Sequence, residues 1–419
     1  MTTTALRRTV ERTTPTRRIA MGVFFIFLGA ATFLLAGGID QGVVTVFGLT
    51  AGGSDVVLPE WTLSSPGTLN LLATVSLALG GYQLVRGFGA WTNWILAVVA
   101  GLFIFSFLVW AAAGKSLNLA GLLSATLIKS VPLTIGAMSG VLCERSGVVN
   151  IAIEGMMLMS AMVGTLVGSL TNLWIGLICA VLAGGLMGLL HAWLSVTYKT
   201  DQIVSGTVIN IFALGMTSFL SAKFLQRYQE LNDPGIFQPM AIPLLSRIPL
   251  IGPLLFNNNL FVYGMFILLI LLHFGLFYTR WGLRLRSVGE HPKAADTLGI
   301  DVFRTRYMAV IMGGLMAGFA GAYFTLGSVG RFDEGLTAGR GFIALAAMIF
   351  GNWMPFGGFG AGLLFGFADA LAARAAILGI PIPSEFLLMT PYIATMIVLA
   401  GVVGRGQMPA ADGQPYEKE

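Results

Sequence analysis

Long apolar runs separated by short polar stretches dominate the sequence. Each clear run has about the 20 residues that a helix needs to cross a hydrocarbon layer of about 30 Å. One further run, 341–355, is shorter and ends in Asn352-Trp353-Met354-Pro355, so it predicts either a half-helix that dips and returns or a short span. The pattern predicts an all-α polytopic bundle of about 10–12 membrane spans. The clear runs lie near 19–37, 66–85, 92–112, 117–141, 148–169, 173–198, 202–224, 259–279, 307–327, 358–376 and 384–404.

The composition agrees with hydrocarbon as the main solvent of the side chains. Hydrophobic residues make up 56% of the 419 residues and charged residues only 10%, whereas soluble domains carry about 25% charged residues. The mean hydropathy is +0.83. The 55 glycines sit inside apolar runs, where a missing side chain lets helix backbones approach closely in lipid. These features exclude a soluble globular protein.

The distribution of positive charge predicts an orientation. The net charge is +5, but the basic residues cluster at the ends of apolar runs, so we attribute the excess to the positive-inside rule and exclude nucleic acid as a partner. With a cytoplasmic N-terminus and twelve spans, 16 of the 24 Lys and Arg residues fall in inside loops and seven in outside loops. The basic stretch before residue 19 and the apolar run after it predict a signal anchor. We therefore expect both termini on the cytoplasmic side of the cell (inner) membrane.

The polar segments also divide the chain. We expect a cytoplasmic N-terminal tail at 1–18, additional transmembrane helices at 19–112, a transmembrane core at 113–405 and a cytoplasmic C-terminal tail at 406–419. The helices at 19–112 carry no notable polar residue within their apolar runs. The core contains the most highly charged loop, 280–306.

The sequence contains no recognisable motif for an enzyme active site or a metal site. The three histidines, His191, His273 and His291, lie far apart, and neither Cys143 nor Cys179 has metal-ligand spacing. Gly114-Lys115-Ser116 resembles the end of a phosphate-binding loop, but Val109 stands where that loop needs a glycine. We therefore predict no catalytic residue, no metal and no cofactor in this chain. Uphill transport would draw energy from an ion gradient or from a separate ATPase.

Polar residues within the apolar runs are candidates for a solute path, because ionisable groups in hydrocarbon usually face a cavity or a partner. Asn150 and Glu154 are four residues apart, which predicts one helix face. Amides and carboxylates would suit the hydroxyls and ring nitrogens of a polar solute. The alternative is that these groups only form interhelical hydrogen bonds, with Glu154 as a cytoplasmic-end gate or an anchor. The candidate path residues are Asn150, Glu154, Gln202, Ser205, Asn210 and Asp369, and Lys129 is a further ionisable group.

The loop 280–306 carries an ordered pattern. Pro292 can open a helix and Gly299 can close one, so the sequence predicts a short cytoplasmic helix from about Lys293 to Leu298. A short rigid helix between two spans can transmit a push from a soluble partner. The alternative is an ordinary solvated, positively charged loop. The candidate coupling residues are Gly289, Glu290, His291, Pro292, Ala294, Ala295, Gly299 and Ile300.

Two blocks resemble known permeases. Ala294-Ala295-Asp296-Thr297-Leu298-Gly299 is similar to the coupling loop of ABC importer permeases, with Lys293 in place of the acidic residue that commonly precedes the alanines. That departure fits the branched-chain amino acid, ribose and nucleoside group. The block from Glu144 to Gly155, ERSGVVNIAIEG, resembles permeases of nucleoside and simple-sugar importers. The resemblance runs from about 117 to 404.

The resemblance implies a complex. Two permease chains, often non-identical, would enclose the path, and two ABC ATPase subunits carrying ATP and Mg²⁺ would dock on the 280–306 loop. A lipid-anchored or periplasmic binding protein would deliver a nucleoside or a related sugar. A rival hypothesis is an ion-gradient-driven secondary transporter, in which Asp369, Glu154 and Lys129 bind or titrate ions. A second rival is a membrane scaffold that transports nothing.

Overall fold

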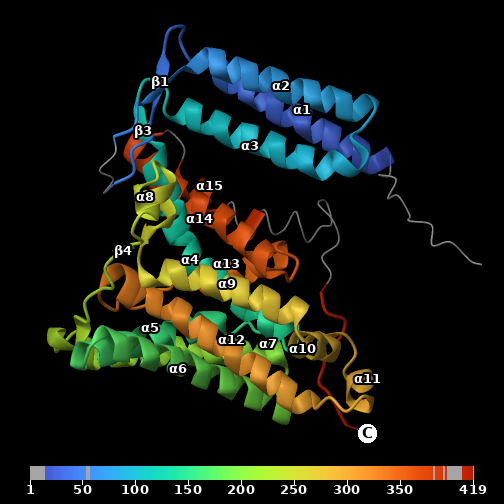
Figure 1. Cartoon of the computed structure of the whole chain (residues 1–419), viewed down its shortest axis with the longest axis vertical. Coiled ribbons are helices and arrows are strands. Elements are labelled where there is room, and N and C mark those ends of the chain that lie inside the picture. Colours follow the sequence, from blue (N-terminus) through green and yellow to red (C-terminus); the bar gives the residue numbers. More distant parts are fainter. Residues whose placement is uncertain (1–14, 53–56, 381–382, 390–391, 394–407, 419) are drawn as a thin grey trace, which may run out of the picture. The chain divides into compact units, whose positions relative to one another are not determined.

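The structure is a computed structural model that describes residues 15–52, 57–380, 383–389, 392–393 and 408–418. It is helical almost throughout, with a few very short strands (Figure 1). The chain divides into two units. The first consists of Met1–Thr50, Val56–Ala120 and Ala375–Pro381, and the second of Ala51–Asp55, Gly121–Arg374 and Ile382–Glu419.

The first unit is a group of three helices with a small sheet. Glycines allow close packing of its first two helices: a Cβ on Gly29 would lie 2.9 Å from the Leu77 side chain, and one on Gly80 would lie 2.7 Å from Ile26. Two of its three strands arise in the stretch 38–65, where β-branched and aromatic residues favour extended backbone. Central strand β1 pairs antiparallel with β2 and parallel with β3. The elements are α1 (Pro15–Gly37), β1 (Val44–Gly48), β2 (Trp61–Ser64), α2 (Ser65–Val85), η1 (Gly89–Trp91), α3 (Thr92–Ala111) and β3 (Ser116–Asn118).

The second unit is a helical bundle. Its long helices are α4 (Leu119–Glu144), α5 (Ile153–Leu170), α6 (Leu173–Ala192), α7 (Gln202–Leu220), α9 (Leu260–Tyr278), α12 (Val302–Phe324) and α14 (Pro355–Leu378). Single π turns extend three of them, at η2 (Trp193–Thr197), η3 (Ser221–Leu225) and η6 (Thr325–Val329). The shorter elements are η4 (Gln229–Asn232), β4 (Met240–Ala241), η5 (Leu245–Arg247), α8 (Ile251–Leu255), β5 (Asn257–Asn258), α10 (Arg280–Glu290), α11 (Pro292–Thr297), α13 (Arg340–Phe350) and α15 (Ser384–Leu388), with β4 and β5 antiparallel.

Ten helices in the described residues are long and apolar enough to cross a membrane, which confirms the predicted polytopic all-α class. The run at 341–355 takes the half-helix form: α13 has 11 residues and is about 16 Å long, half of a hydrocarbon layer. The turn after it contains Asn352 and Trp353, both with positive φ. The predicted span at 384–404 lies mostly outside the described residues.

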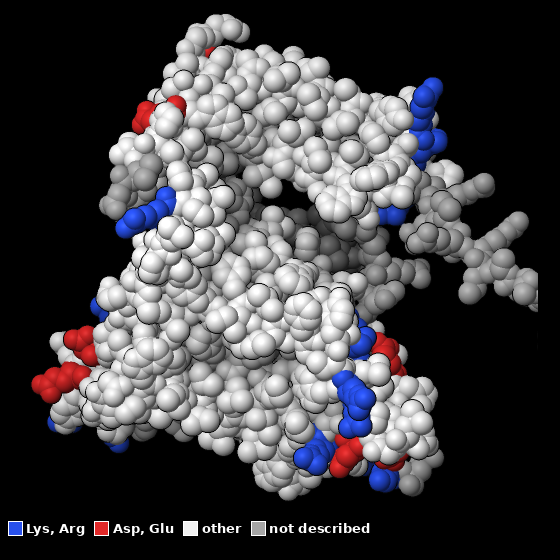
Figure 2. Space-filling model, in the orientation of Figure 1, with Lys and Arg blue, Asp and Glu red and all other residues white. Residues whose placement is uncertain are grey.

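Glycine-lined contacts bring α6 and α12 together. A Cβ on Gly184 would lie 2.4 Å from the carbonyl oxygen of Gly314, and one on Gly188 would lie 3.0 Å from the Gly314 Cα. Lipid supplies no hydrophobic driving force between helices, so such backbone proximity is a main source of helix association. In the second unit, the charged side chains on the face shown in Figure 2 gather at the two ends of the helices, and the flanks between them are uncharged. One of these ends carries α10 and α11 (Figure 1).

Candidate functional site

The segment between α4 and α5 is not helical, which corrects one prediction. Helix α5 begins at Ile153, so Asn150 and Glu154 do not share a helix face. Asn150 lies in a turn instead, where its Oδ1 accepts a hydrogen bond from the backbone N–H of Ala152 at 3.1 Å. Asn side chains favour such turns because they bond to backbone two residues further on. The polar side chain therefore shapes the backbone before α5.

Side chains from α6 and α7 hold the same segment at Val149. The Oε1 of Gln202 accepts from the Val149 N–H at 2.7 Å, and His191 Nε2 lies 2.9 Å from the Val149 carbonyl oxygen. A carbonyl only accepts, so Nε2 donates. In the neutral imidazole, Nδ1 then accepts from the Ser205 hydroxyl at 3.0 Å. Both backbone groups of Val149 therefore have hydrogen-bond partners, although Val149 belongs to no helix or strand.

Asn210 on α7 also holds the segment between α4 and α5. Its Oδ1 accepts from the Gly155 N–H at 2.8 Å, and its Nδ2 donates to the Ile151 carbonyl at 2.9 Å. Gln202, Ser205 and Asn210 therefore support irregular backbone. Their placement favours the packing alternative over direct contact with solute. His191 supports this segment as well. The only feature of the sequence that could have indicated this role is a single polar ring within an apolar run.

Glu154 reaches from α5 to the start of half-helix α13. Its Oε1 accepts from the Thr337 hydroxyl at 2.5 Å and from the Gly339 N–H at 2.8 Å, and its Oε2 accepts from the Gly341 N–H at 2.6 Å. The first N–H groups of a helix have no partner within the helix and carry partial positive charge. A carboxylate satisfies both needs, so this geometry favours the anchor role that the sequence left open for Glu154.

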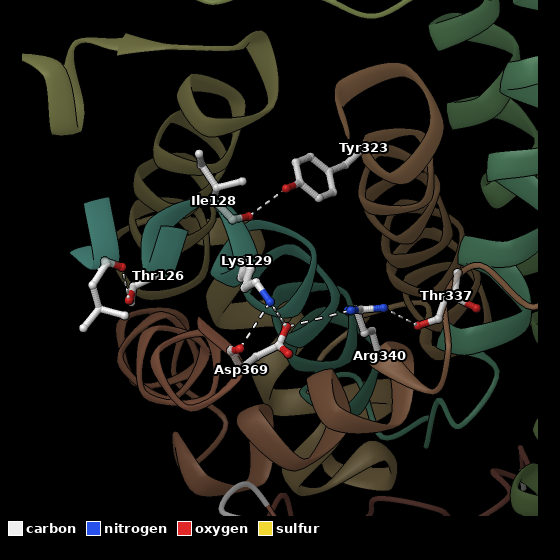
Figure 3. Close-up of polar contacts among 8 residues, drawn as sticks. Thr126, Ile128, Lys129, Tyr323, Thr337, Arg340 and Asp369 are labelled. Carbon is white, nitrogen blue, oxygen red and sulfur yellow. Dashed lines mark hydrogen bonds and ion pairs between the residues drawn. The ribbon is translucent and has the colours of Figure 1, made fainter. Parts of the chain in front are cut away.

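Three charged side chains from three helices meet in the bundle (Figure 3). Lys129 Nζ on α4 lies 3.1 Å from Asp369 Oδ2 on α14, and Arg340 Nη2 on α13 lies 3.8 Å from the same oxygen. Each of the three side chains is about one-third exposed, at 33%, 28% and 34% for Lys129, Asp369 and Arg340. Arg340 is the first residue of α13, and its side chain points toward Asp369 (Figure 3).

A cavity of about 270 Å³ adjoins this cluster. Arg340 and Asp369 supply its charged groups, and apolar and aromatic side chains supply the rest of its wall. An apolar pocket with a few converging polar groups is the usual form of a small-molecule site. Of the candidate path residues, Asp369 lies on its wall. The lining residues are Leu133, Ala338, Arg340, Ile343, Phe365, Asp369, Leu388 and Tyr392.

The loop 280–306 folds as two helices, and α11 confirms the predicted short helix. Pro292 occupies its first turn, and His291 Nδ1 accepts from the Ala294 N–H at 3.1 Å. Gly299 closes it with φ +80°. The Ile300 N–H donates to the Ala295 carbonyl at 3.1 Å, and the Gly299 N–H donates to the Asp296 carbonyl at 2.9 Å, the two bonds of a Schellman cap. Helix α10 was not predicted.

Helix α11 has one buried residue, Ala295, which is 2% exposed, whereas Leu298 is 81% exposed. An exposed leucine beside a rigid turn is available to a protein partner. Helix α10 contacts the segment between α4 and α5, because a Cβ on Gly289 would lie 2.2 Å from the Arg145 carbonyl oxygen. Gly289 is therefore required by close approach. Among the described residues, no group of three or more His, Cys, Asp or Glu could hold a metal ion.

Comparison with known proteins gives consistent matches to one class. Residues 122–403 match the family described as the permease component of branched-chain amino acid transport systems. The guanosine ABC transporter permease protein NupQ of Bacillus subtilis is 42% identical over 308 residues, 70% of this chain and 95% of NupQ. The nucleoside ABC transporter permease protein NupC of Lactococcus lactis is 42% identical over 305 residues, 70% of this chain and 95% of NupC.

A third relative is named for a different solute. The putative glucose ABC transporter permease protein TsgC13 of Haloferax volcanii is 33% identical over 328 residues, which cover 72% of this chain and 98% of TsgC13. No solved structure matches the chain. The family match begins at residue 122, so α1, α2 and α3 lie before it.

Proposed function

The chain is a multi-pass membrane protein of the family of branched-chain amino acid transport system permease components, and on that premise we propose that it forms the transmembrane path of an ABC importer for nucleosides. The similarity to NupQ and NupC, over 95% of the length of each, carries the choice of solute. A simple sugar is the second candidate, because TsgC13 is named for glucose.

The cavity beside Asp369 has the chemistry that a nucleoside needs. A nucleoside is uncharged at neutral pH, and its ribose hydroxyls both donate and accept hydrogen bonds. The Asp369 carboxylate accepts, whereas Lys129 and Arg340 donate. Phe365 and Tyr392 offer aromatic surface to a base. We propose that this cluster contacts the solute during transport.

A chain of contacts connects the cytoplasmic loop to this cavity. Helix α10 packs on the turn at Arg145 through Gly289. Arg145 Nε donates to the Trp353 carbonyl at 3.0 Å, and the Trp353 indole N–H donates to the Glu144 carboxylate at 2.5 Å. Trp353 follows α13, whose first residue is Arg340 at the cavity. A displacement of α10 and α11 would therefore be transmitted to α13. The two positive-φ residues of its turn are the place where such movement would be absorbed.

Other subunits would complete the transporter. Separate ATPase subunits would bind ATP and Mg²⁺ and dock on α11, and a second permease chain would complete the path. A lipid-anchored or periplasmic binding protein would deliver the solute. The loop that carries α11 and the segment 408–418 would face the cytoplasm together, because the two are in contact.

The test is reconstitution of the tagged chain, with the subunits that co-purify with it, in proteoliposomes. Labelled guanosine, glucose and leucine are offered with and without Mg-ATP on the ATPase side. We expect guanosine uptake that needs ATP. Uptake by the chain alone, driven by an ion gradient without nucleotide, would support the secondary transporter. ATP-driven uptake of glucose or leucine in place of guanosine would overturn the choice of solute.

A further inference from the structure

The C-terminal segment Met408–Lys418 lies across α10 and α11 (Figure 1). Its first contacts involve two of the candidate coupling residues. The Ala411 N–H donates to the Gly289 carbonyl at 2.9 Å, and the Ala410 N–H lies 3.2 Å from the Glu290 carboxylate oxygen, to which it donates. The end of α10 is therefore capped by this segment.

The far end of the segment is fixed to α11 by Tyr416, which is only 6% exposed. Its hydroxyl donates to Asp296 Oδ2 at 2.8 Å, and its ring centroid lies 5.4 Å from that of Phe303 on α12. Lys418 Nζ lies 3.5 Å from the other Asp296 oxygen. The ring also packs in a cluster with Val288, Ala295 and Val302, one residue from each of α10, α11 and α12.

The middle of the segment reaches the transmembrane helices. Arg306 of α12 is 1% exposed, and its Nη1 donates to the Gln414 carbonyl at 2.8 Å. The Ala411 carbonyl oxygen would lie 3.1 Å from a Cβ on Gly147, so the segment also covers the turn after α4. Lys199, in the turn between α6 and α7, pairs with Glu417 at 2.7 Å.

These contacts bear on how α11 keeps its position. A helix of six residues has no stability of its own in water, since helices shorter than about 12 residues are marginal even in favourable sequences. Its one buried residue, Ala295, belongs to the same buried cluster as Tyr416. Without the segment, α11 would keep the cap at Gly299 but would lose much of its fixed surface. A loose helix cannot transmit a push.

We propose that residues 408–418 form part of the ATPase-docking surface, as a clamp that holds α11 on α10 and α12. This inference rests on the proposed function, in which α11 receives the ATPase. The partner would meet a composite surface made by the exposed side of α11 and by the C-terminal segment. ATP-driven movement of α11 would reach the Arg145 turn only while the clamp is in place.

The first experiment needs neither ATPase nor solute. Hydrogen exchange of the amides of Ala295, Gly299 and Ile300 is followed in the full chain in detergent. Tyr416→Ala should speed this exchange by about tenfold, and Tyr416→Phe, which removes only the bond to Asp296, by less. Met408→Ala is the matched control, since this side chain is exposed on the same segment. Unchanged exchange in Tyr416→Ala would overturn the clamp.

The second experiment uses the complex with its ATPase. Tyr416→Ala should retain the ATPase through purification and lower solute uptake per ATP hydrolysed by about tenfold, while Met408→Ala behaves as the wild type. Unchanged uptake per ATP would contradict the coupling role. If the wild-type complex imports no nucleoside, the proposed function fails, but the exchange experiment still decides whether the segment holds α11.

Discussion

The carboxylate of Glu154 lies 2.6 Å from the backbone nitrogen of Gly341, across the contact between α5 and half-helix α13. The contact is close because Gly341 has no side chain: a Cβ there would lie 2.5 Å from the Glu154 Cα. The two residues thus act together. The missing side chain of Gly341 lets α5 approach, and the Glu154 carboxylate compensates the positive charge at the start of α13.

Replacing Glu154 with Ala should release the start of α13. The two backbone bonds that it accepts are made to a charged group, and each such bond contributes about 1.5–3 kcal/mol. We expect a lower thermal unfolding midpoint in detergent and a loss of solute uptake larger than the loss of inserted protein. Glu154→Gln, which keeps one acceptor oxygen, should be intermediate.

Glu230→Gln is the control for Glu154, because Glu230 is an exposed acidic residue in the short helix η4. Uptake by Glu154→Ala equal to that of this control would refute the anchor.

Gly299→Val should uncouple ATP hydrolysis from uptake. Gly299 has φ +80°, where a β-branched residue is strained by about 1–3 kcal/mol, and the Schellman cap of α11 depends on it. The altered chain should insert normally, and the ATPase should hydrolyse ATP with uptake reduced at least about tenfold.

Gly235→Val gives a matched control for Gly299, since Gly235 has φ +75° in a loop far along the chain from α11. Both variants carry the same kind of backbone strain. If the two lower uptake per ATP equally, strain alone explains the effect and the role of the cap in coupling is lost.

The sequence predicts this molecule unevenly, for physical reasons. The apolar runs predict the spans because a helix in lipid needs only length and hydrophobicity, and Pro292 and Gly299 predict α11 because their backbone preferences are local. The hydrogen bonds from Asn210 to the backbone of the 145–155 segment could not be predicted, since these groups become neighbours only when α7 packs beside α5. The polar segment 408–418 likewise carries no periodicity that would place Tyr416 against Asp296.

Asp369→Asn should lower solute uptake by about tenfold or more and change stability little. The cluster is partly exposed, and ion pairs of that kind contribute about 0–1 kcal/mol, so the carboxylate is better explained by contact with solute than by stability. The measurement pairs uptake of labelled guanosine with the unfolding midpoint.

A charge exchange separates the two roles of this cluster. Lys129→Asp combined with Asp369→Lys keeps one acid and one base at the same contact. If the pair only joins α4 to α14, the double variant should recover the uptake that Asp369→Asn loses. We expect no recovery, because the groups would meet the solute in reversed positions.

Asp412 should make the clamp weaken as pH rises. Burial raises the pKa of Asp412 to about 7 from an ordinary 3.8, opposed in decreasing order by Glu144 of α4, by the Gly413 backbone and by the Arg306 charge. The docked carboxyl therefore keeps a proton that the released one loses. Docking is strongest below about pH 4, declines by up to about tenfold per pH unit as pH rises to about 7, and then stays constant.

Exchange of the α11 amides between pH 5 and 8, corrected for the intrinsic rate, should show this decline. Asp412→Asn cannot ionise at this position, so its corrected exchange should be slower at pH 8 and should depend less on pH than that of the wild type. A wild-type profile as flat as that of Asp412→Asn would show that this carboxyl does not control the clamp.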